Sequence, residues 1–88
     1  MEVLVGSMVR SLAGHDKSDY FIVLSINGEY AYVADGKLRK VESPKKKKLK
    51  HLQKSGKVAV ELKERLDNNE CVENFEVRKA LAELVRTN

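Results

Sequence analysis

Apolar and polar residues alternate with a period close to two along the first half of the chain, a pattern typical of β-strands. The clearest run covers residues 20–26, which are aromatic, β-branched and apolar, as in a strand buried on both faces. Asn27-Gly28 follows it and is a strong hairpin signal. Strands are expected at 3–13, 20–26, 30–34 and 37–41, with a short last strand anchored by Leu49 and Leu52. Five short strands joined by tight turns predict a small antiparallel barrel.

The spacing of apolar residues changes after Ser55-Gly56, from the period of a strand to that of a helix. Two helices are expected, one from Val58 to 67–69 and one ending at Arg86, with Asn74 as its N-cap. Neither helix is long enough to be stable alone in water, so the helices should pack on each other or on the barrel. The sequence therefore predicts a mostly β protein with C-terminal α structure: a barrel over residues 1–53 and a helical extension over residues 54–88.

Charge is distributed unevenly along the 88 residues. The segment 34–57 carries ten basic residues and two acids, a balance of +8, whereas the stretches before and after it each carry −2. Such a concentration of positive charge indicates a polyanionic partner, and nucleic acid is the leading candidate.

The lysine run 45–48 follows Ser43-Pro44, and proline interrupts strand pairing, so the run is expected as a loop between strands. Lysines on such a loop would reach several phosphates, with Lys37 and Arg39 projecting from the preceding strand. About five phosphate contacts would give a plot of log K against log salt with a slope of roughly −3.5 to −4.5. Tyr30 and Tyr32 share one face of their strand; they would stack bases if that face is exposed, or else serve in core packing.

No catalytic constellation, phosphate-binding loop or metal-ligand spacing is present, so neither an enzyme nor a cofactor is expected. The adjacent pair His15-Asp16 could act as a base and its orienting group in an enzyme acting on RNA, which is the weakest alternative. The single cysteine, Cys71, can form no internal disulfide. With no apolar run near the length of a membrane span and no signal-peptide pattern at the N-terminus, a reducing cytoplasm is expected.

Three motifs together are fairly specific: AGHDK at 13–17, VADGK at 33–37 and PKKKKLKHL at 44–52. Through them the first 53 residues resemble KOW-motif proteins, most closely the small bacterial KOW-domain RNA-binding proteins. These are related to large-subunit ribosomal proteins of archaea and eukaryotes. The resemblance implies a five-stranded SH3-like barrel that binds RNA, with ribosomal RNA as the expected target. The broader motif has a further glycine where this chain has Ser18-Asp19.

The combined expectation is a non-catalytic RNA-binding module of the ribosome or its assembly, with RNA and ribosomal proteins as partners. No membrane or small-molecule substrate is expected. The alternative is a protein-protein interaction module in a translation or transcription complex, which would use exposed apolar surface instead of the lysines. The predicted RNA-binding residues are Gly14, His15, Asp16, Lys17, Lys37, Arg39, Lys45, Lys46, Lys47, Lys48, Lys50 and His51.

Overall fold

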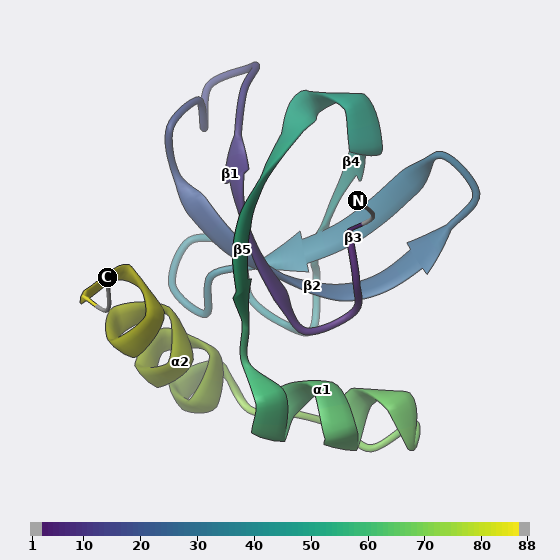
Figure 1. The fold of residues 1–88 in the computed structure, drawn as a ribbon, viewed down its shortest axis with the longest axis vertical. Helices are drawn as coiled ribbons and strands as arrows, with labels where there is room; N and C mark the ends of the chain where they lie inside the picture. Colours follow the sequence, from purple (N-terminus) through teal and green to yellow (C-terminus); the bar gives the residue numbers. More distant parts are fainter. Residues whose placement is uncertain (1–2, 87–88) are drawn as a thin grey trace.

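The computed structural model describes residues 3–86, and these form a curled sheet with two C-terminal helices (Figure 1). The elements in chain order are β1 (Ser7–Ser11), β2 (Tyr20–Asn27), β3 (Tyr30–Ala34), β4 (Lys45–Lys48), the 3-10 helix η1 (Leu49–His51), β5 (Leu52–Val58), α1 (Val60–Asp67) and α2 (Asn74–Arg86). The predicted class, mostly β with C-terminal α, is confirmed.

All five strands are antiparallel to their neighbours in one sheet of order β4-β3-β2-β1-β5. The predicted hairpin joins β2 to β3 through a tight turn, since Asn27 pairs with Tyr30. The edge strands β4 and β5 are not hydrogen-bonded to each other, so the sheet is open. However, η1 alone connects them, which limits the separation of Lys48 and Leu52 to at most about 14 Å. The sheet therefore curls until its two edges approach each other at the η1 end.

The strand predicted at 37–41 is wrong: these residues form a loop between β3 and β4. The Asp35 side chain causes this, because its Oδ1 accepts hydrogen bonds from the backbone N–H of Lys37 at 2.8 Å and of Arg39 at 2.9 Å. Such local side-chain bonds compete with strand pairing for the backbone donors. Leu38, an apolar residue in the middle of this loop, is 92% exposed.

The loop predicted at 45–48 is also wrong, because the lysine run forms β4 and pairs with β3. Pro44 comes directly before this strand, so its missing N–H removes no bond from the ladder. As an edge strand, β4 can tolerate charged residues that a central strand could not, and lysines are common on such edges.

Apolar side chains gather on the two opposite faces of the sheet. The cluster enclosed by the curled sheet consists of Val9, Phe21, Val23, Ala31, Val33 and Leu52. The cluster on the other face joins strands to helices and consists of Met8, Ile22, Ala59, Leu62, Val72, Val77 and Leu81. The helices thus pack on the sheet, which was one of the two expected arrangements. The last strand, β5, continues to Val58, beyond residue 53, where the barrel was predicted to end.

The N-terminus of α2 is fixed to the loop between β3 and β4. Asn74, expected as the N-cap, is instead the first helical residue, and its Oδ1 accepts a hydrogen bond from the Val41 N–H at 2.8 Å. Arg78 donates to the Gly36 carbonyl at 2.6 Å. Gly36 has a φ of +78°, and a side chain there would overlap the Asn74 carbonyl, so this contact requires glycine.

Candidate nucleic-acid interface

The four lysines of β4 alternate between the two faces of the sheet. Pairing with β3 places Lys45 opposite Val33 and Lys47 opposite Ala31, two residues of the enclosed cluster. Lys46 and Lys48 lie opposite Tyr32 and Tyr30 on the outer face. Burial follows this alternation, since Lys47 is only 7% exposed whereas Lys46 and Lys48 are exposed.

The inward pair forms a polar cluster with the loop that follows β1, which we call the Asp16 cluster: Ser11, Ala13, Asp16, Lys45 and Lys47. The Lys47 ammonium donates three hydrogen bonds of 2.8 Å, to Ser11 Oγ, the Ala13 carbonyl and Asp16 Oδ1. These satisfy all the donors of a lysine, as burial requires. Lys45 Nζ lies 2.9 Å from Asp16 Oδ2 in an ion pair that lacks the angles of a hydrogen bond.

Asp16 remains a carboxylate in this cluster. Burial raises the pKa of its carboxyl group, but hydrogen bonds from Lys47 and Ser11 and the ammonium of Lys45 lower it further, so the net pKa lies well below its ordinary value. The ionised Asp16 compensates the two inward ammonium groups. The cluster therefore fixes the loop of residues 12–19 against β4, and it brings together the 14–17 motif and the lysine run, far apart in the sequence.

The outward pair shares its face with two tyrosines. We call Tyr30, Tyr32, Lys46 and Lys48 the β3–β4 face. Both tyrosines are half-buried, and the Lys46 ammonium lies over the Tyr30 ring, 4.3 Å from its centroid. The face thus combines exposed positive charge with aromatic rings on paired strands, a combination typical of single-stranded nucleic-acid binding surfaces.

The remaining predicted residues fall into two groups. Gly14, His15 and Lys17 are exposed on the loop after β1, and this loop contacts η1, because the Leu12 N–H donates to the His51 carbonyl at 2.9 Å. On η1, Lys50 is exposed and His51 is half-buried. η1 lies at the end of the sheet opposite the two helices (Figure 1).

Lys37 and Arg39 belong elsewhere: their loop is fixed to the N-terminus of α2 instead of lying on the β3–β4 face. The structure therefore groups ten of the twelve predicted residues around β4, the loop after β1 and η1, and separates these two. The sequence did not indicate Ser11 and Ala13, whose hydroxyl and carbonyl oxygens accept hydrogen bonds from Lys47. No signal within residues 45–48 separates the inward from the outward lysines, because the four residues are identical.

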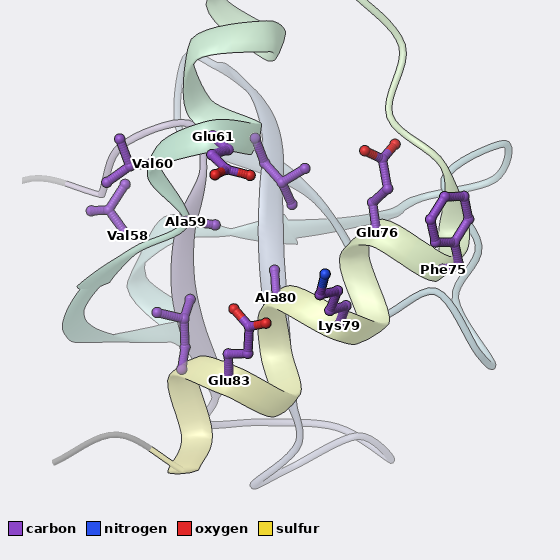
Figure 2. Close-up of a pocket in the computed structure, with 11 residues that line it drawn as sticks. Val58, Ala59, Val60, Glu61, Phe75, Glu76, Lys79, Ala80 and Glu83 are labelled. Carbon is purple, nitrogen blue, oxygen red and sulfur yellow. The ribbon is translucent and has the colours of Figure 1, made fainter.

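A second surface feature is an open groove between the start of α1 and one side of α2 (Figure 2). Val60, which is 69% exposed, lies on one side, and Phe75, which is 60% exposed, lies at the N-terminal end of α2. Lys79 and Glu83 also line it from α2. The groove offers apolar contact area with scattered charges. Within residues 3–86, no group of three His, Cys, Asp or Glu residues is placed to hold a metal ion.

No protein-family model matches this chain, and no curated protein sequence matches it. Among the described residues, no helix has the length and apolar character needed to cross a membrane.

Proposed function

We propose that this chain is a non-catalytic RNA-binding module of the cytoplasm that binds ribosomal RNA of the large subunit or of its assembly. The observation that carries the proposal is the alternation in β4, which presents Lys46 and Lys48 outward beside two tyrosines while the Asp16 cluster holds the strand from behind. An SH3-like barrel, as the resemblance implies, fits the strand order and the short η1 connection between the edge strands.

Phosphate contacts should dominate the affinity, as in recognition of RNA by shape and charge. The Lys47 ammonium is buried and Lys45 is paired with Asp16, so neither is available to neutralise a phosphate. The exposed cations around β4 are Lys17, Lys46, Lys48 and Lys50. With four such contacts, the expected slope of log K against log salt is roughly −2.8 to −3.6, shallower than the slope expected for five contacts.

Fluorescence anisotropy with a labelled fragment of large-subunit ribosomal RNA tests the electrostatic proposal. The titration is repeated at salt concentrations between about 50 and 200 mM. The double variant Lys46→Gln/Lys48→Gln should bind more weakly and lower the steepness of the slope by roughly 1.4 to 1.8. Lys79→Gln, an exposed lysine on α2, is the matched control and should behave as the unmodified protein. A salt-independent affinity, or equal effects of the two variants, would contradict the proposal.

Fractionation of a native lysate on sucrose gradients tests the ribosomal assignment separately. Migration with the large subunit at low salt, lost at high salt, is the expected result. Migration at the top of the gradient under both conditions would remove the ribosome from the proposal while leaving RNA binding to the anisotropy measurement.

The second candidate function is a protein-protein interaction module, and the groove between α1 and α2 is the observation that favours it. Val60 and Phe75 are large exposed apolar residues that line the groove at opposite ends. In that case Phe75→Ser would abolish partner binding in co-precipitation, whereas Lys46→Gln/Lys48→Gln would leave it intact. The RNA proposal predicts the opposite pattern for RNA binding.

A further inference from the structure

The β3–β4 face carries a row of aromatic side chains on β3 and a parallel row of lysines on β4. Tyr30 and Tyr32 are two residues apart on one strand, and Lys48 and Lys46 lie opposite them on the next strand. Residues two apart on a strand are separated by about 6.6 Å, and neighbouring strands lie about 4.8 Å apart. Each tyrosine therefore has one lysine beside it at a fixed, short distance, and the pair repeats once along the strands.

Core packing does not account for the two tyrosines. Neither tyrosine belongs to the enclosed cluster or to the cluster on the other face, which joins strands to helices. The neighbouring residues Ala31 and Val33 do belong to the enclosed cluster. The helices pack over Met8 and Ile22 on the same outer face and leave Tyr30 and Tyr32 outside their cluster. The rings are therefore held in place by the strand and keep part of their surface in solvent.

From this arrangement we infer that the β3–β4 face binds unpaired RNA, with bases stacked on Tyr30 and Tyr32 and adjacent phosphates neutralised by Lys46 and Lys48. This inference rests on the proposed RNA-binding function and specifies its substrate class. A duplex cannot supply the same contact, because its bases are already stacked on each other and present only their edges in the grooves. Nucleotides in loops, bulges and ends can turn their faces onto aromatic side chains.

The Lys46 ammonium that covers the Tyr30 ring does not block this mode of binding. An exposed cation–π contact favours its closed form by only about two- to fivefold. Stacking of one base on an aromatic ring is worth about five- to 150-fold in affinity. The base therefore displaces the lysine from the ring, and the released ammonium is then close to the phosphate of the same nucleotide.

Intrinsic tyrosine fluorescence provides a direct readout, because the chain has three tyrosines and no tryptophan. The Tyr20→Phe variant leaves only Tyr30 and Tyr32 as emitters. Titration of this variant with an unpaired oligoribonucleotide of about ten residues should quench its emission, since stacked bases quench tyrosine. The same strand annealed to its complement should bind through charge alone and leave the emission nearly unchanged.

Substitutions identify the rings responsible. Tyr30→Leu/Tyr32→Leu should weaken binding to the unpaired strand by about 30-fold or more and leave binding to the duplex nearly unchanged. Tyr30→Phe/Tyr32→Phe keeps both rings and should retain the affinity, which shows that the rings and not the fold are responsible. Tyr20→Leu is the matched control, because Tyr20 also lies beneath a cation, Arg10, but at the opposite end of β2.

Each contrary result has a distinct meaning. Equal affinities for unpaired and duplex RNA, with no quenching and no effect of the leucine substitutions, would overturn the stacking inference and leave the proposed function standing. Failure of both RNAs to bind the unmodified protein at low salt would overturn the proposed function together with the inference.

Discussion

Four chemically identical residues in one strand lie in two different environments in this protein. Lys45 and Lys47 point toward the enclosed side of the sheet, where Lys47 is 7% exposed and makes three hydrogen bonds. Lys46 and Lys48 point to the outer face and are exposed beside Tyr30 and Tyr32. Strand pairing, and not the number of lysines, therefore determines how much charge this basic run exposes to solvent.

The two environments are connected through β4. A buried ammonium is tolerated only when a carboxylate and further acceptors compensate it, and Asp16, Ser11 and Ala13 supply these. This buried contact holds β4 and the loop after β1 in place. The outward lysines are then presented from a rigid strand, which would lower the entropy lost in the proposed binding of RNA.

The largest effect that separates the two pairs is expected in stability. Lys47→Ala removes the buried ammonium and leaves Asp16 and the Ala13 carbonyl without their main partner, so unfolding should become easier by about 4 kcal/mol. Lys46→Ala, the same substitution one position earlier, should change stability by less than about 0.5 kcal/mol. Urea denaturation of both variants measures this difference. Equal losses in the free energy of unfolding would show that the inward lysine does not stabilise the fold more than the outward one.

A smaller loss, of about 2 to 3 kcal/mol at neutral pH, is expected for Asp16→Asn, which leaves the Lys47 ammonium buried without a counter-charge. The pKa of Asp16 is lower in the folded than in the unfolded chain, where it has its ordinary value of 3.8. Its contribution is therefore complete above that value and is lost as the pH falls toward the folded-state pKa. The gap in stability between the protein and Asp16→Asn should shrink on acidification below about pH 4.

Urea denaturation at a series of pH values from neutral to acidic checks this dependence. Asp16→Ala should show the same trend, since the charge and not the amide geometry is responsible. A gap that stays constant down to acidic pH would mean that Asp16 does not stabilise the fold through its charge.

The smallest effect is expected for a single outward lysine. Lys48→Gln should leave the unfolding midpoint unchanged and reduce the steepness of the salt dependence of RNA binding by roughly 0.7 to 0.9, one phosphate contact. Anisotropy titrations at several salt concentrations measure it. An unchanged slope combined with a lower melting temperature would assign Lys48 to the fold instead of the binding surface.

The parts of the fold that the sequence predicted correctly have strong local signals. The β2–β3 hairpin follows from its apolar strands and Asn27-Gly28, and the two helices follow from their apolar spacing. The region between β3 and β5 was predicted wrongly for two physical reasons. Asp35 captures backbone donors locally, and a run of identical lysines carries no period-two signal, so only its pairing with β3 assigns the faces.

For the candidate site, residue types were predictable and their grouping was not. The sequence singled out the 14–17 motif and the lysine run separately, and their joining through Asp16 depends on the fold. Likewise, the exposure of Tyr30 and Tyr32 could be stated only as one of two alternatives, because alternation gives a shared face without showing what covers it.

An NMR titration of the isotope-labelled protein with an unpaired oligoribonucleotide, following the backbone amides, locates the binding surface directly. If the β3–β4 face binds unpaired RNA, we expect saturable shifts for Tyr30, Tyr32, Lys46 and Lys48 and for the adjoining 14–17 loop, with the amides of Val60 and Phe75 unmoved. Shifts confined to the groove around Val60 and Phe75, with the β3–β4 face unchanged, would overturn this assignment and favour the helical surface as the binding site.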